Sequence, residues 1–204
     1  QSLSTPTATL SAPERAASVN DSSASQADGI EQLASTFRKI APFIAAHRGA
    51  TVVIHVPGEC LESELCPSLA DDIVLLHTLG MKIVLVVGCR PQIDRRLYLS
   101  GHNTDATDKR TGCRPSDDFV LQQVVESWGW CRVQVQSHVG RGLLTNAQIK
   151  KLGLQGGMVH VASGNFVIAR PVGIVNGVDM MYAGVVRRIN VGRLSQLLDS
   201  GDIV

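Results

Sequence analysis

Several features that would assign a protein to a functional class at once are missing from this chain. Its 204 residues carry a formal net charge of only +1, so no excess of one sign favours a nucleic acid or an anionic membrane surface as a partner. No apolar run approaches the roughly 20 residues needed to cross a bilayer. The five cysteines form no CxxC pair and the six histidines no HExxH motif, which argues against a disulfide framework and a zinc site. We therefore expect a globular protein that binds no nucleic acid, no membrane and no metal.

The first residues lack the apolar surface that a packed core needs. Residues 1–29 are dominated by Ser, Thr and Ala, and a segment of this composition is predicted to be disordered. Ser-rich, acid-poor segments are typical of organellar transit peptides, and an inert linker fits the composition equally well. Because the chain begins at Gln1 rather than Met, we expect a processed or partial sequence. The composition favours a chloroplast protein, with a cytoplasmic or mitochondrial location as alternatives.

Residues 30–204 are predicted to form one domain, which opens with an amphipathic helix. Apolar residues from Ile30 onward fall on one helical face at spacings of three and four. Pro42 lies inside this pattern and predicts a kink or a break, because proline removes a helical hydrogen bond. Two interpretations stay open, a helix that packs on the core and an arm that packs on a neighbouring subunit. The residues on this face are Ile30, Leu33, Phe37, Ile40, Ala41 and Ile44.

The next segment has the pattern of a parallel α/β fold. Two β-branched apolar runs, Thr51–Val56 and Lys82–Val87, end in turns that contain Gly or Pro, as buried parallel strands do. Each run is followed by a helical pattern, over Ser68–Leu79 and Pro91–Ser100. The order strand–helix–strand–helix predicts a mainly parallel sheet sandwiched by helices, with right-handed crossovers.

The remainder of the chain mixes helical and extended patterns. Asp117 is a suitable N-terminal cap for the helix that follows it, and Asn176-Gly177 is a strong hairpin-turn signal. The predicted elements are helices over Asp117–Trp128, Asn146–Lys151 and Val191–Asp199, strands over Cys131–Gln136, Met158–Ala162, Asn165–Arg170 and Ala183–Ile189, and the beginning of a strand at Ile203-Val204.

The turns after the two parallel strands differ from phosphate-binding turns. Such turns are rich in glycine because backbone N–H groups must approach the phosphate oxygens closely. The first turn instead contains Pro57, which has no N–H, and the second contains Cys89 and Arg90. The scaffold therefore resembles that of a nucleotide-handling kinase whose phosphate site is degenerate.

Six short segments carry a resemblance to a known family through their shared order and spacing. They are Ala46-His-Arg-Gly49, Asp72-Ile-Val-Leu-Leu-His-Thr-Leu-Gly80, Arg90-Pro-Gln-Ile-Asp94, Ser163-Gly-Asn-Phe-Val-Ile-Ala-Arg-Pro171, Asn176-Gly-Val-Asp179 and Leu198-Asp-Ser-Gly-Asp-Ile-Val204. From about Phe37 to Val204, the chain resembles the amino-acid-kinase domain of N-acetylglutamate synthases of the bacterial and plant form.

The resemblance implies an amino-acid-kinase (carbamate-kinase-like) fold, which looks truncated because the chain stops at what resembles the entry to a further strand. It implies a parent enzyme that transfers an acetyl group from acetyl-CoA to L-glutamate, the first step of arginine biosynthesis, in a separate C-terminal domain. This part would then provide feedback inhibition by L-arginine and homo-oligomerisation, with no catalytic residue and no cofactor of its own. The alternative is a non-catalytic protein that associates with the synthase or with acetylglutamate kinase.

The resemblance also indicates how the kinase phosphate site has changed. In the kinase relatives a lysine and two glycines mark the end of the first strand, where this chain has His55, Pro57 and Gly58. Three glycines follow the second strand, where this chain has Gly88, Cys89 and Arg90. A neutral imidazole does not replace the charge of an ammonium group, so this chain is not expected to be a working kinase.

Four residues are implied as ligand contacts. Arg114 matches the arginine that grips the substrate carboxylate in the kinases, although its basic loop also fits a solvated position. Arg90 could clamp a carboxylate with two hydrogen bonds or form a structural salt bridge. The helix around Phe37 to His47 corresponds to the family segment that packs between subunits and lines part of the arginine site, which adds Phe37 and Phe43.

Overall fold

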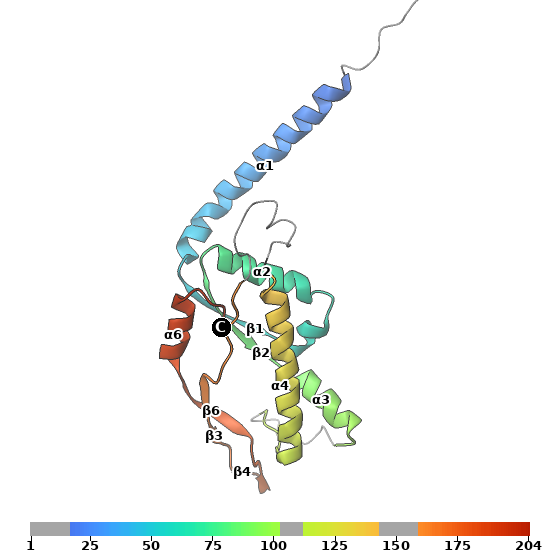
Figure 1. Ribbon diagram of the computed structural model, residues 1–204, viewed down its shortest axis with the longest axis vertical. Helices are drawn as coiled ribbons and strands as arrows, with labels where there is room; N and C mark the ends of the chain where they lie inside the picture. Colours follow the sequence, from blue (N-terminus) through green and yellow to red (C-terminus); the bar gives the residue numbers. More distant parts are fainter. Residues whose placement is uncertain (1–16, 103–111, 143–158) are drawn as a thin grey trace, which may run out of the picture. The chain divides into compact units, whose positions relative to one another are not determined.

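The computed structural model describes residues 17–102, 112–142 and 159–204 (Figure 1). The chain divides into two compact units, Gln1–Ala46 and His47–Val204. In the described part of the first unit the backbone forms a single helix, α1, which spans Ala17–His47. The second unit contains the remaining helices and the strands.

Helix α1 is longer than the sequence pattern predicts. It begins at Ala17 rather than Ile30, and the disorder of residues 1–29 stays a prediction. Adding residues to an existing helix costs far less than starting one, and this stretch contains no proline. The helix also continues through Pro42 without the predicted break. Its apolar stripe, represented by Ile30 and Phe37, is exposed.

The second unit opens with the predicted strand–helix–strand–helix order. The elements are β1 (Thr51–Val56), the 3-10 helix η1 (Gly58–Glu62), α2 (Cys66–Thr78), β2 (Lys82–Val87) and α3 (Arg90–Leu99). Strands β1 and β2 are parallel and paired from Thr51–Lys82 to Val56–Val87, so their C-terminal ends lie side by side. Helices α2 and α6 both contact β2. The predicted α/β fold with a parallel sheet and flanking helices is confirmed.

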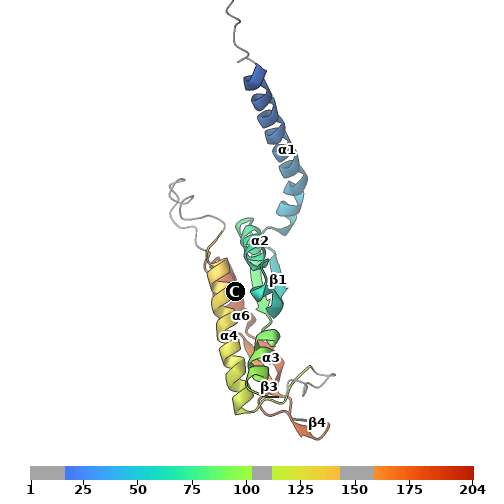
Figure 2. The ribbon, with the colours of Figure 1, turned by 90° about the vertical axis from the view of Figure 1, so that its right-hand side faces the viewer.

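Helix α4 (Asp118–Val139) corrects one prediction, because it continues through Cys131–Gln136, which was predicted to be a strand. The alternation of apolar residues in that stretch imitates a strand, but the buried positions of α4 are three and four residues apart, as in a helix. The predicted cap is confirmed, since an Asp117 carboxylate oxygen accepts a 2.8 Å hydrogen bond from the backbone N–H of Val120. The C-terminal part of α4 lies against α2, and the N-terminal part of α4 lies against α3 (Figures 1 and 2).

The C-terminal third forms hairpins and a last helix. Asn176 and Gly177 have φ angles of 52° and 79°, which confirms the predicted tight turn. The predicted helix over 146–151 lies outside the described residues, and residues 159–162, predicted as part of a strand, form only an isolated bridge from Val161 to Ile203. The elements are β3 (Val167–Pro171), β4 (Ile174–Val175), β5 (Val178–Asp179), β6 (Gly184–Ile189) and α6 (Val191–Asp199), with β3 antiparallel to β6 and β4 to β5.

The end of the chain extends the sheet beside β2, as predicted. The backbone N–H of Val204 donates to the Ile83 carbonyl over 3.1 Å, and the Val204 carbonyl accepts from the N–H of Leu85 over 2.7 Å. Ile83 and Ile203 are completely buried and belong to the hydrophobic core between the sheet and α2 and α4. Among the described helices, none is long and apolar enough to span a membrane.

Candidate functional site

The predicted phosphate-site residues meet at the C-terminal edge of β1 and β2. The backbone N–H of Gly88 donates to the Val56 carbonyl over 2.8 Å, which brings the two turns together. A Cβ atom added at Gly88 would lie 3.7 Å from His55 Nε2 and 3.7 Å from Pro57 Cα. The two turns therefore form one surface, as the parallel register requires.

The beginning of α3 packs closely against the first turn at Gly58. A Cβ atom added at Gly58 would lie 2.5 Å from Gln92 Oε1 and 2.8 Å from the Gly88 carbonyl oxygen. The Gln92 side chain is 6% exposed, and its Nε2 donates to the Gly58 carbonyl over 2.8 Å and to Glu62 Oε1 over 3.0 Å. Sequence reasoning missed Gln92, because a glutamine in the first turn of a helix usually faces solvent. Here it occupies the position in which a phosphate-binding turn would be open.

An ion pair fixes α3 against η1 beside this turn. Both Glu62 carboxylate oxygens accept hydrogen bonds from the Arg95 guanidinium, one of them over 3.1 Å. The hydrogen bonds from Arg95 lower the pKa of Glu62 and outweigh the opposing effect of its partial burial. Glu62 therefore stays ionised and serves as a structural partner rather than as a proton acceptor for a reaction.

A cavity of about 400 Å³ borders the end of β2 on the other side of the second turn. It is lined by the turn Gly88–Arg90, by Asp94 and by Arg114, so the structure brings the two predicted ligand arginines into one pocket. The Arg114 side chain is only 13% exposed, which corrects the alternative that it is solvated, and it donates a short hydrogen bond to Asp94 Oδ1. Arg90 Nε lies 3.7 Å from Asp94 Oδ2, as in the salt-bridge alternative.

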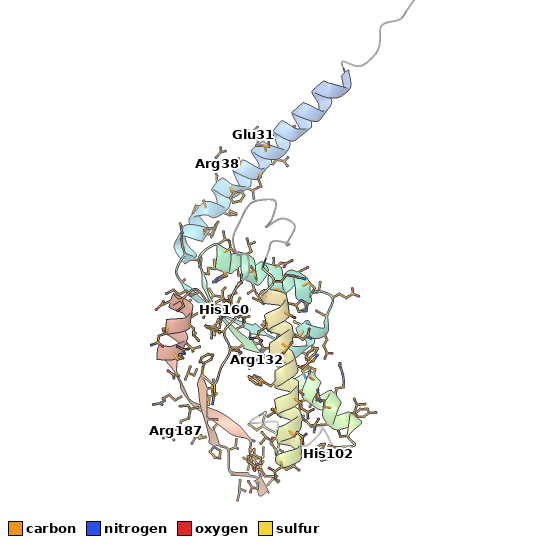
Figure 3. The ribbon with its side chains drawn as sticks, in the orientation of Figure 1. Glu31, Arg38, His102, Arg132, His160 and Arg187 are labelled. Atoms are coloured by element: carbon orange, nitrogen blue, oxygen red, sulfur yellow. The ribbon has the colours of Figure 1, made fainter. Side chains whose placement is uncertain are left out.

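A second cavity, of about 330 Å³, is mainly apolar. It lies between β2 and α4, and its lining includes Trp128, Cys131, Phe166 and Val204. Arg132 projects from α4 at this cavity, with its guanidinium 5.7 Å from the centroid of the Trp128 ring (Figure 3).

The cysteines near these cavities, Cys89 and Cys131, are thiols of low reactivity. Burial raises the pKa of Cys89, and it raises the pKa of Cys131 to about 11. Both side chains are therefore neutral thiols near neutral pH, whereas nucleophilic attack and metal binding require thiolates. In the described part of the chain, no group of three or more His, Cys, Asp or Glu side chains could hold a metal ion.

Phe37 and Phe43 both lie on α1, in the first unit, with exposed fractions of 56% and 68%. Phe43 is six residues after Phe37 and lies off the apolar stripe that contains Phe37. Their predicted role in ligand binding stays a prediction.

Comparison with known proteins identifies the family. The model of the amino acid kinase family matches residues 50–204, the greater part of the chain. The chain belongs to the amino acid kinase family. This confirms the predicted fold, and the interpretation of the edge of β1 and β2 as a degenerate phosphate site stays a prediction.

The curated relatives that the chain matches are longer proteins. It is 38% identical over 173 residues to an amino-acid acetyltransferase of Yersinia enterocolitica, covering 85% of this chain and 37% of that protein. An amino-acid acetyltransferase of Yersinia pseudotuberculosis is equally similar, over 174 residues. The chain thus spans little more than a third of the length of these curated relatives.

Solved structures give the same result. A crystal structure of N-acetylglutamate synthase from Neisseria gonorrhoeae complexed with coenzyme A and L-arginine matches 84% of this chain and 38% of that one, with a TM-score of 0.71 and 33% identity. The same enzyme complexed with coenzyme A and N-acetyl-glutamate gives a TM-score of 0.69 at 33% identity, over 84% of this chain and 36% of that one.

Proposed function

We propose that this chain is the regulatory, non-phosphorylating part of an amino-acid N-acetyltransferase that makes N-acetyl-L-glutamate from acetyl-CoA and L-glutamate. The observation that carries the proposal is the 38% identity to an amino-acid acetyltransferase over 85% of the chain, in a region that belongs to the amino acid kinase family. Acetyl transfer would then be carried out by another part of the protein, in arginine biosynthesis.

The first test is the mass of the native polypeptide in its source cells, detected with an antibody against residues 51–94. The proposal predicts a polypeptide well above the 21.8 kDa of this chain. A polypeptide near 21.8 kDa would favour the alternative, a non-catalytic protein that associates with the synthase or with acetylglutamate kinase.

We expect the chain to have no kinase activity. Gln92 packs against Gly58, and His55 stands where the kinases have a lysine, so the end of β1 does not carry the lysine that would stabilise a transferring phosphoryl group. Incubation with MgATP and N-acetyl-L-glutamate should release no more ADP than a protein-free blank, with an acetylglutamate kinase as positive control. ADP release above the blank that scales with the amount of pure chain would contradict this expectation.

The pocket beside β2 is the second element of the proposal. Arg90 and Arg114 supply positive charge at the beginning of α3, where the helix dipole also favours an anion. We assign this pocket to the carboxylate of a small amino-acid-like ligand, because guanidinium groups pair well with carboxylates. N-acetyl-L-glutamate is a suitable probe, since it combines a carboxylate with an acylated amino group.

Regulation by L-arginine, self-association and location complete the proposal. The gonococcal synthase complexed with L-arginine supports L-arginine as inhibitor. We assign Phe37 and Phe43 on α1 to the contacts of L-arginine from the family resemblance of this helix alone. The exposed apolar stripe of α1 supports homo-oligomerisation, which sedimentation would measure.

The Ser-rich composition of residues 1–29 supports a chloroplast location, which imaging of a fluorescent fusion would test.

A further inference from the structure

We propose that Asp94 is a built-in competitor for the anion site of the pocket beside β2. Its carboxylate takes the place on Arg114 that a ligand carboxylate would take, so a ligand binds only by displacing it. The inference rests on the proposed carboxylate-binding role of this pocket, and it adds a regulatory contact to it.

The contacts of Asp94 carry the proposal. Asp94 Oδ1 accepts a short hydrogen bond from Nη2 of Arg114, and Oδ2 lies 3.7 Å from Nε of Arg90. One carboxylate thus engages both arginines that line the cavity. A bound ligand carboxylate would be expected to make the same pair of contacts, because guanidinium donors and carboxylate oxygens match in geometry.

Burial gives this contact its effect. The Arg114 side chain is 13% exposed and the Asp94 side chain 36%, so the cation is the more buried member of the pair, and both residues line the cavity. A buried guanidinium without an anion is costly. When a ligand carboxylate replaces Asp94, Arg114 keeps a negatively charged partner. A ligand can therefore displace Asp94, but it must compete with Asp94 for Arg114.

The position of Asp94 on α3 connects ligand binding to the helix. The N-terminal cap of α3, Cys89, makes no side-chain capping bond, and no acidic residue lies in the first turn. The partial positive charge at this helix end therefore adds to that of Arg90 and Arg114. Asp94 lies one turn further along the same helix, so its release from Arg114 removes a link between α3 and the segment that begins at Gly112.

The opposite role for Asp94 makes the opposite prediction. If Asp94 only positioned Arg114 for the ligand, removal of its charge would weaken ligand binding. If it competes with the ligand, removal of its charge strengthens binding, because the pocket loses a negative charge close to the bound anion. The sign of the change in affinity therefore separates the two roles.

The test compares the wild-type chain with Asp94→Asn and Asp94→Ser in calorimetric titrations with N-acetyl-L-glutamate. We expect the two variants to bind the probe about tenfold more tightly than the wild type, and we expect Arg114→Gln in the Asp94→Asn background to cancel the gain. Asp199→Asn is the matched control, because it breaks the exposed Lys82–Asp199 ion pair away from the pocket and should leave the affinity unchanged. Circular dichroism verifies that each variant is folded.

Different outcomes would overturn the competitor role of Asp94 and the carboxylate-binding role of the pocket. Binding to the wild type together with equal or weaker binding to both Asp94 variants would overturn the competitor role and leave the carboxylate pocket in place. Absence of binding to the wild type and to both folded Asp94 variants would overturn the carboxylate pocket as well.

Discussion

The Ile83→Ala variant is expected to lose about 4 kcal/mol in the free energy of unfolding, the largest effect of any substitution considered. Ile83 has no exposed surface, and it lies in β2 between β1 and the C-terminal residues. Its carbonyl accepts the hydrogen bond from Val204, so its side chain packs where the C-terminal residues join the sheet. Removing most of this side chain leaves a cavity in the hydrophobic core. Urea unfolding followed by far-ultraviolet circular dichroism measures the loss.

A neighbouring strand provides the control for Ile83. Val53 pairs opposite Val84 in the register of β1 and β2, and its side chain is 64% exposed. The Val53→Ala variant should lose less than about 1 kcal/mol, because little apolar surface returns to water. Similar losses in the two variants would show that β2 is not at the centre of the core.

The Gly58→Ala variant should lose about 3 kcal/mol, the second largest effect. An added methyl group would lie 2.5 Å from Gln92 Oε1, 2.8 Å from the Gly88 carbonyl oxygen and 2.9 Å from Pro91 Cδ. Two of these atoms belong to a backbone and a proline ring, which cannot rotate away, so the beginning of α3 must shift. We expect this shift to break the bond from Gln92 to the Gly58 carbonyl, and thermal or urea unfolding measures the result.

Gly129 is the matched control for this substitution. It lies inside α4, and apart from the backbone of its own helical turn and its chain neighbours, no atom of the described residues lies within 4 Å of a Cβ atom added there. Replacement by alanine should stabilise the chain by about 0.5–1 kcal/mol, because glycine is unfavourable inside a helix. A Gly58→Ala variant as stable as the wild type would contradict the close packing of α3 on the first turn.

The first half of the second unit could be predicted from the sequence because its signals are local. The runs Thr51–Val56 and Lys82–Val87 are continuous and β-branched, and the helices after them begin near prolines and end near glycines. The failure at Cys131–Gln136, which was predicted to be a strand and lies in α4, has a physical cause. The helix extends through a segment whose own pattern is ambiguous, because elongation and packing outweigh weak local preferences.

The candidate site was predictable only in part. The parallel register brings the two strand ends together, so the approach of His55, Pro57 and Gly58 to Gly88 and Cys89 follows from the order of the elements. Arg90 and Asp94 are four residues apart on α3, a spacing that the sequence shows, whereas the contact of Arg114 with Asp94 joins residues 20 positions apart, which no local pattern encodes. Gln92 was missed for the same reason, since its burial arises from the contact of α3 with the first turn.

We have proposed that this chain is the regulatory part of an L-glutamate N-acetyltransferase. The most direct test captures the native protein from its source cells with an antibody against residues 51–94 and supplies acetyl-CoA and L-glutamate. Mass spectrometry then quantifies N-acetyl-L-glutamate with and without L-arginine. We expect acetyl transfer to be captured with the protein and to fall when L-arginine is added. Depletion of the native protein from the extract with the acetyl-transfer activity left behind in the supernatant would contradict it.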